Sequence, residues 1–189
     1  MKLRAATSRA WLAAVLADFD AFLLDHAACE RKASATAMAF VSHYPDRTAL
    51  VRACLEIARE ELEHFGRVWE RLTARGLVLA PDAPNPYVAR LARAYRKGSD
   101  AYFLDRLLAT AIVEARGCER FGLVAAALPE GADREFYREL ARTEVRHGEV
   151  YLELARLYFP AEDVARRADE LLALEARVVE ELPARAAMY

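Results

Sequence analysis

Apolar residues recur at alternating steps of three and four along most of this chain, the spacing that places them on one face of an α-helix. The pattern predicts six helices, over residues 8–44, 46–75, 86–97, 99–128, 132–159 and 160–182. Proline or glycine, which end helices, stands at each expected break, at Pro45, Gly76, Gly98, Pro129 and Pro160. The segment 77–85 contains two further prolines and is expected to be irregular. The predicted fold class is all-α.

The connections between the helices indicate how they are arranged. Helices 8–44 and 46–75 are joined by a short turn, as are helices 99–128 and 132–159, so each pair should form an antiparallel hairpin. A much longer connection joins the two hairpins, which is the ferritin-like arrangement of a four-helix bundle. We therefore predict a single ferritin-like domain over residues 1–189, with helix 160–182 as a C-terminal fifth helix.

Each of the four long helices has a glutamate inside its apolar stripe. In the first of them the stripe consists of Leu12, Leu16, Phe19, Leu23, His26, Glu30, Ala33, Ala37 and Phe40. In the second and fourth long helices, the glutamate is followed three residues later by a histidine on the same face. The same pattern therefore occurs once in each hairpin. The candidate residues are Glu30, Glu61, His64, Glu114, Glu144 and His147.

Four ionised carboxylates in a dry bundle would each lose several kcal/mol of hydration, and they would also repel one another. Two divalent cations would supply four positive charges, and imidazoles can bind them as neutral nitrogen ligands. One glutamate from each of two helices, with Glu-x-x-His from each of two others, is the ligand set of a di-iron or di-manganese four-helix bundle. We therefore predict that the six residues bind two iron ions, with manganese as the alternative, and are catalytic through them.

Several residues close to these positions have alternative interpretations. His26 precedes Glu30 by one turn and is expected to support the site or line its cavity, although it could also be a ligand. Glu119 is expected to face solvent or support the site, unless a π-bulge turns it inward. Tyr151 is expected in the core, with a place in the wall of the active cavity as the alternative.

Composition and charge narrow the class of protein. Alanine, leucine, arginine and glutamate dominate, and there are only seven glycines and seven prolines, as in a helical protein. The formal net charge is −2, so no global field attracts a polyanion. Three isolated cysteines suggest neither a disulfide framework nor an iron–sulfur site. No signal peptide or membrane span is recognised, and a cytoplasmic location is expected.

Four runs around the candidate residues resemble the bacterial tRNA-(2-methylthio-N6-isopentenyladenosine) hydroxylases, a family of the ferritin-like di-iron superfamily. The runs are residues 26–32 (HAACERK), 58–64 (AREELEH), 112–121 (IVEARGCERF) and 143–147 (TEVRH). The resemblance implies a non-haem di-iron monooxygenase that hydroxylates the isopentenyl group of this nucleoside beside the tRNA anticodon. It implies O2 as co-substrate, two external electrons, and the same six residues as iron ligands. It also implies two partners, the tRNA anticodon loop and an electron-donor protein or reductase.

A tRNA partner requires basic side chains for the phosphates and flat side chains on which unpaired bases can stack. One local cluster before the third long helix has both kinds of residue. Its members are Tyr87, Arg90, Arg93, Tyr95, Arg96 and Lys97. The alternative interpretation of this cluster is an ordinary solvated helix face.

Two other classes of protein remain open at this point. The first is a ferroxidase or peroxide-consuming protein like ferritin or rubrerythrin, without an RNA substrate; the cysteine-rich iron module of rubrerythrin is absent. The second is a non-catalytic helical scaffold whose inward glutamates are neutral or paired with arginines. Metal analysis distinguishes the scaffold from the other two.

Overall fold

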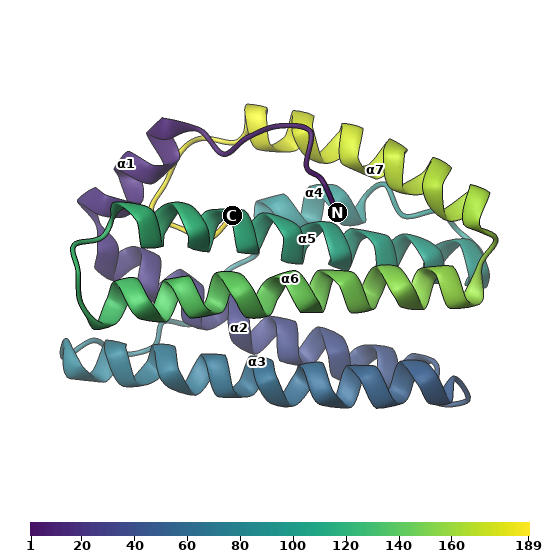
Figure 1. The fold of residues 1–189 in the computed structure, drawn as a ribbon, viewed down its shortest axis with the longest axis horizontal. Coiled ribbons are helices and arrows are strands. Elements are labelled where there is room, and N and C mark those ends of the chain that lie inside the picture. Colours follow the sequence, from purple (N-terminus) through teal and green to yellow (C-terminus); the bar gives the residue numbers. More distant parts are fainter. The chain divides into compact units, whose positions relative to one another are not determined.

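The computed structural model describes all 189 residues and contains seven helices and no strands. The helices are α1 (Arg9–Ala17), α2 (Phe19–His43), α3 (Thr48–Ala74), α4 (Pro86–Ala92), α5 (Ser99–Ala127), α6 (Ala132–Tyr158) and α7 (Ala161–Glu181) (Figure 1). The chain divides into two compact units. We call residues 13–83 and 185–188 the α2–α3 unit, and residues 1–12, 84–184 and 189 the α5–α6 unit. No helix is both long and apolar enough to span a lipid bilayer.

The prediction of one continuous helix over residues 8–44 is wrong, because the chain leaves the helical conformation at Asp18. The side chain of Asp18 accepts a hydrogen bond from the backbone N–H of Ala21 at 3.0 Å, so it caps the N-terminus of α2. The break changes which face of the first segment is buried. Leu16, predicted on the inner stripe, is 45 % exposed, whereas Trp11 and Val15 are buried.

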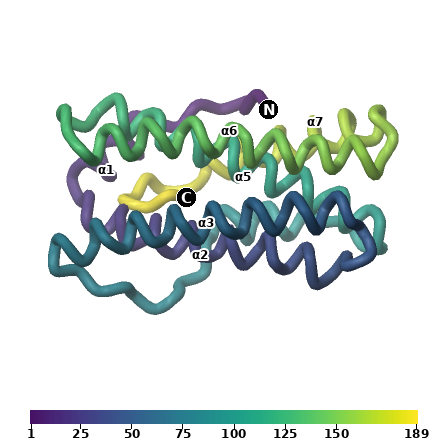
Figure 2. Tube along the Cα trace, turned by 60° about the horizontal axis from the view of Figure 1, so that its bottom comes forward, coloured from purple at the N-terminus to yellow at the C-terminus, as the bar shows by residue number.

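The α2–α3 unit is an antiparallel hairpin, with α2 and α3 side by side in Figure 2. Apolar side chains from both helices are fully buried, among them Phe22 and Phe40 from α2 and Leu50 from α3. At the end of α3, Gly76 has a φ of 70°, a left-handed conformation that suits glycine at the residue after a helix. The following segment returns to α2, where Lys32 donates a hydrogen bond to the carbonyl of Ala83 at 2.8 Å.

The α5–α6 unit contains a second antiparallel hairpin, and α7 packs along α5 and contacts α4. The ring of Phe103 lies 5.6 Å from that of Tyr158, and the ring of Phe121 lies 5.7 Å from that of Tyr137. Figure 1 shows α5 beginning at the end of this unit where α6 ends and α7 begins. The single-domain organisation of residues 1–189 stays a prediction.

Helix α4 ends at Ala92, five residues before its predicted end, because the following residues bind elsewhere. The backbone N–H of Arg96 donates to Asp105 of α5 at 2.7 Å, and the Arg96 side chain donates to the same carboxylate. Arg167 of α7 also donates to Asp105, at 2.8 and 2.9 Å. Asp105 therefore joins α5, α7 and the loop after α4; we call this group of three side chains the Asp105 clamp.

Burial alone would raise the pKa of Asp105, but hydrogen bonds from Arg167 and Arg96 outweigh burial and lower it below its ordinary value. A lowered pKa in the folded state stabilises the protein above the pKa of the unfolded chain. That stabilisation disappears as the pH falls through the pKa of the folded state.

We therefore expect Asp105→Asn to lower the free energy of unfolding by about 1.5 to 3 kcal/mol at neutral pH, because charge-assisted hydrogen bonds are lost. The difference from wild type should shrink as the pH falls below about 4. Urea unfolding at a series of pH values measures both quantities. Asp163→Asn, which removes an exposed ion pair with Arg166, is the control and should change stability little. A constant difference across this pH range would contradict the assignment.

Candidate metal-binding residues

In the α2–α3 unit, the middle turns of both helices bring together three of the predicted ligands. Glu30 lies on α2, and Glu61 and His64 lie three residues apart on one face of α3; all three side chains are buried. The Nδ1 atom of His64 lies 3.6 Å from Oε2 of Glu30 and 3.7 Å from Oε2 of Glu61. Each residue offers a ligand atom within 4.8 Å of those of the other two. We call this group the first triad.

His26 contacts the first triad from within α2. Its Nε2 atom lies 2.6 Å from Oε1 of Glu30, one turn along the helix, and its ring stacks on that of Phe22. Both residues are buried. His26 therefore restricts the orientation of the Glu30 carboxylate, as groups that contact metal ligands commonly do.

The α5–α6 unit contains a matching group. Glu114 lies on α5, and Glu144 and His147 lie three residues apart on α6, with all three side chains buried. The Nδ1 atom of His147 lies 3.1 Å from Oε2 of Glu144. The three residues offer ligand atoms within 4.8 Å of one another. We call this group the second triad.

Gly148, the residue after His147, sets how closely α6 approaches α5. A Cβ atom at this position would lie 3.3 Å from the backbone oxygen of Ala111 and 3.5 Å from Cβ of Glu114. The first distance is shorter than ordinary van der Waals contact, and the atom concerned belongs to the backbone of α5. The absence of a side chain at Gly148 thus permits the helix spacing that holds Glu114 beside Glu144 and His147.

The donor atoms of both triads suit a divalent cation. Metal–ligand distances of about 2.1 Å place two ligands of one ion no more than about 4.2 Å apart. The separations from His64 to Glu30 and Glu61, and from His147 to Glu144, lie within this limit. Each triad has two carboxylates and one imidazole, so one divalent ion would cancel the charge of two ionised glutamates. Oxygen and nitrogen donors without thiolate favour iron or manganese.

Comparison with known proteins identifies the family. A family model described as tRNA-(ms2io6A)-hydroxylase (MiaE) matches residues 1–188. The tRNA 2-(methylsulfanyl)-N(6)-isopentenyladenosine(37) hydroxylase of Pseudomonas putida is 36% identical over 174 residues, which cover 92% of this chain and 84% of that protein. This chain belongs to the MiaE family. The resemblance found in the sequence is therefore confirmed.

Two further relatives extend the comparison. The hydroxylase of the same description from Salmonella typhimurium is 34% identical over 143 residues, 76% of this chain; the match spans about half of that protein, 52% of its length. A solved structure, protein 43 with aldehyde deformylating oxygenase activity from Synechococcus, is 36% identical. It covers 98% of this chain, with 94% of its own chain matched and a TM-score of 0.93. This likeness confirms the predicted all-α, ferritin-like fold class.

In this MiaE-family chain, Glu119 does not turn toward the second triad, and α5 is α-helical throughout without a π-bulge. Its carboxylate accepts hydrogen bonds from the backbone N–H and hydroxyl of Thr7 and pairs with Arg116. Tyr151 is buried, in agreement with a core position. That the six triad residues are metal ligands stays a prediction.

The predicted RNA-binding cluster is only partly at the surface. Tyr87 is fully buried, stacks on Tyr189 at 4.8 Å between ring centroids, and donates to Glu175 at 3.0 Å. Tyr87 cannot stack on a base, so the prediction that it binds RNA is wrong. Arg90 pairs with Glu181 at 2.7 Å. Arg96 belongs to the Asp105 clamp. Of the remaining residues of the predicted RNA-binding cluster, Arg93 and Lys97 are exposed and Tyr95 is half-buried.

Sequence reasoning missed a second buried polar cluster. Arg116 of α5 is fully buried and donates to Glu175 of α7 at 2.8 and 3.0 Å. It also donates to the carbonyl of Ala5 at 2.8 Å, which attaches the N-terminal segment. A signal was present, because Glu175 lies between Leu171 and Val178 on the buried face of α7, as the triad glutamates do on theirs.

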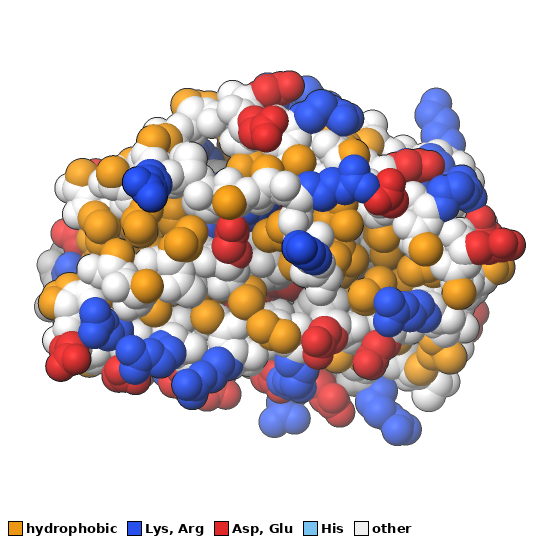
Figure 3. Space-filling model, turned by 45° about the horizontal axis from the view of Figure 1, so that its top comes forward, with side chains coloured by type: hydrophobic (Ala, Val, Ile, Leu, Met, Phe, Trp, Pro, Cys, Tyr) orange, Lys and Arg blue, Asp and Glu red, His pale blue; other side chains and the backbone are white.

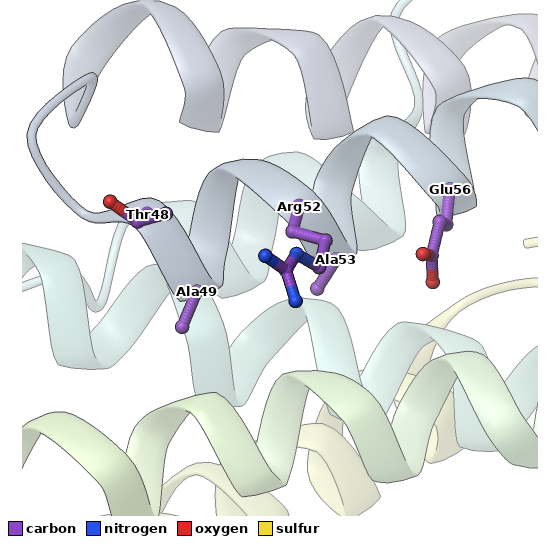
Figure 4. A pocket seen from close by; sticks show the side chains of 5 residues that line it. All are labelled: Thr48, Ala49, Arg52, Ala53 and Glu56. Atoms are coloured by element: carbon purple, nitrogen blue, oxygen red, sulfur yellow. The ribbon is translucent and has the colours of Figure 1, made fainter.

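A surface hollow of about 430 Å³ lies along the first turns of α3, away from the first triad in the sequence. Figure 4 shows its lining side chains, Thr48, Ala49, Arg52, Ala53 and Glu56. None of them is a predicted ligand, and the only charged groups among them are one guanidinium and one carboxylate. The hollow adds no residue to the candidate metal site.

We expect Gly148→Ala to lower the free energy of unfolding by about 1 to 3 kcal/mol, because backbone atoms of α5 must move to admit the methyl group. Gly122→Ala on α5, where nothing lies within 4 Å of the added atom, is the matched control and should raise it by about 0.5 to 1 kcal/mol. Urea unfolding measures both. Equal stabilisation by the two alanines would contradict a close approach at Gly148.

Proposed function

We propose that this chain is an O2-dependent di-iron tRNA hydroxylase. Its substrate would be the isopentenyl group of 2-methylthio-N6-isopentenyladenosine, and each triad would hold one iron ion. The observation that supports this most is the presence of two matched, buried Glu–Glu–His triads in a member of the MiaE family. The predicted assembly of both ions into one dinuclear centre stays a prediction and is part of this proposal.

The triad residues and His26 have distinct roles in the proposed reaction. The two glutamates of a triad neutralise the cation, and the histidine adds a neutral donor that leaves the total charge unchanged. His26, at 2.6 Å from Glu30, holds that carboxylate in one orientation. Burial of the triads, with exposures of 8 % or less, keeps bulk water from the donors. Iron, when bound, supplies the activation of O2.

The reaction requires an electron donor from outside the chain. Hydroxylation of a C–H bond by O2 consumes two electrons and two protons, and it gives the alcohol and one water molecule. The protein's own side chains cannot supply two electrons at every turnover, because nothing in the chain would reduce them again. We therefore include a reductase or small electron-transfer protein among the partners.

The Synechococcus structure supports one further candidate activity. Its title names aldehyde deformylating oxygenase activity, and its identity to this chain, 36%, equals that of the Pseudomonas hydroxylase. An aldehyde is therefore the second substrate to test. A ferroxidase of the ferritin type differs from both candidates, because it would oxidise ferrous iron without forming an organic product.

The first experiment measures metal binding. After anaerobic reconstitution with ferrous iron, wild type should contain about two iron ions per chain. Glu61→Ala and Glu144→Ala should each lower that content, because each removes one carboxylate from a triad. Glu63→Ala and Glu149→Ala change exposed glutamates on the same two helices and should leave it unchanged. Fewer than about one iron per wild-type chain would contradict the metal assignment.

The second experiment identifies the product. Purified, iron-loaded protein is incubated with tRNA that carries the prenylated adenosine, with O2 and a chemical reductant, and the nucleosides are analysed by mass spectrometry. We expect one oxygen atom added to the prenyl group, and no product with Glu144→Ala. A parallel reaction with an aldehyde should give no deformylated product. Iron oxidation without any organic product would replace the hydroxylase proposal with the ferroxidase.

A further inference from the structure

The loop between α4 and α5 is held rigidly in the α5–α6 unit. The Asp105 clamp fixes Arg96 through both its backbone and its side chain, and Arg167 adds a bond of 2.7 Å to the carbonyl of Ala94. Gly98, with a φ of 97°, then turns the chain into α5. Side chains that project from this loop therefore start from a preorganised backbone.

An aromatic and cationic group lies on this rigid base. The ring of Tyr102, on the first turn of α5, meets the ring of Tyr95 edge to face at 5.8 Å between centroids. The guanidinium of Arg106, one turn further along α5, lies over the Tyr102 ring at 5.8 Å. Tyr102 is nevertheless 42 % exposed. Burial raises the pKa of Tyr95 to about 12, so its phenol stays neutral.

Two exposed cations lie two residues before and two residues after Tyr95 in the sequence. Arg93 caps the C-terminus of α4 and Lys97 precedes Gly98, and both side chains are open to solvent. Basic and acidic side chains are interspersed on the face drawn in Figure 3. A polyanion would therefore have to be recognised by a local group of residues rather than by the net charge of −2.

We propose that Arg93, Lys97, Tyr102 and Arg106 form a surface that binds the RNA strand beside the target nucleotide. Tyr102 stacks on an unpaired base, and the cations contact phosphates. The inference rests on the proposed tRNA substrate and specifies where that substrate is held. It replaces the buried Tyr87 and the paired Arg90 of the sequence-based cluster with Tyr102 and Arg106. We name the group the α4–α5 surface.

The length of α5 between Tyr102 and the second triad matches the length of a short stretch of stacked nucleotides. Twelve residues of α5 separate Tyr102 from Glu114, which corresponds to about 18 Å of helix. Stacked nucleotides advance roughly 3.4 Å each, so this length equals about five nucleotides. A loop nucleotide at the metal and a stacked or paired neighbour at the α4–α5 surface would therefore belong to one anticodon arm.

The test measures binding of a fluorescent anticodon stem–loop by anisotropy. Tyr102→Ala should weaken binding about 5- to 150-fold, the equivalent of one lost base stack, whereas Tyr102→Phe keeps the ring and should bind like wild type. Replacing Arg93 and Lys97 together by glutamine should reduce the slope of log Kd against log salt by about 0.7 for each lost phosphate contact. Arg166→Gln, an exposed arginine of α7, is the control and should leave both quantities unchanged.

Kinetics show whether the effect concerns binding alone. When the tRNA concentration is varied, Tyr102→Ala should have a higher KM for tRNA than wild type. Its kcat at saturating tRNA should equal that of wild type, because Tyr102 does not contact the reacting atoms. Iron content and circular dichroism of each variant establish that it is folded. A general loss of structure in Tyr102→Ala would instead lower kcat and iron content together.

Three results would overturn the inference. If wild type hydroxylates tRNA while all the surface variants bind it equally well, the α4–α5 surface is wrong and the proposed function stands. If RNA binding is unchanged but the KM for a protein electron donor rises, the surface belongs to the donor. If wild type neither binds nor modifies tRNA, the proposed function and the inference fail together.

Discussion

The cost of burying charge within apolar helix faces constrains this structure more than any other interaction. Glutamates occupy buried positions on α2, α3, α5, α6 and α7, where a hydrophobic residue would continue the stripe. An ionised carboxylate in such a position loses hydration worth several kcal/mol and requires a positive charge or hydrogen bonds in return. The protein meets this requirement with arginine in one set of positions and has imidazole-containing triads in the other.

The arginine solution is complete within the chain. Glu175 receives two hydrogen bonds from Arg116 and a third from Tyr87, and Asp105 receives several from Arg96 and Arg167. Planar guanidinium groups match carboxylates in geometry and remain charged at any ordinary pH. These clusters therefore need no further cation. They stabilise the packing of α5 against α7 and the loop after α4.

The triads differ from these arginine clusters in the kind of charge they contain. Imidazole contacts the carboxylates of Glu30, Glu61 and Glu144, and a neutral imidazole does not cancel their charge. Two carboxylates with one imidazole are a poor internal ion pair and a good donor set for one divalent cation. Because the same set appears once in each unit, a metal-binding role explains the repeated pattern better than a structural role does. A purely structural role would not require the Glu-x-x-His spacing to occur in both units.

Periodicity in the sequence predicted much of this arrangement, for a physical reason. Helix positions three and four residues apart share a face, so Glu61 with His64 and Glu144 with His147 are neighbours in any regular helix. The break at Asp18 escaped prediction because an aspartate interrupts an apolar pattern in the same way whether it caps a helix or faces solvent. The early end of α4 depends on Asp105, which lies several residues further along the chain.

Contacts between distant residues decide which side chains can reach a substrate, and local sequence patterns do not contain this information. Tyr87 is buried by Tyr189 and Glu175, about a hundred residues away, whereas Tyr102, which also lies in the first turn of a helix, is exposed.

The two units also differ in a way that bears on specificity. Both contain a helix hairpin with a triad, but α4, α7 and the Asp105 clamp belong to the α5–α6 unit. The shared parts contain the proposed metal ligands. Helices α4 and α7 and the Asp105 clamp, which occur in one unit only, are therefore the parts that can distinguish one substrate from another.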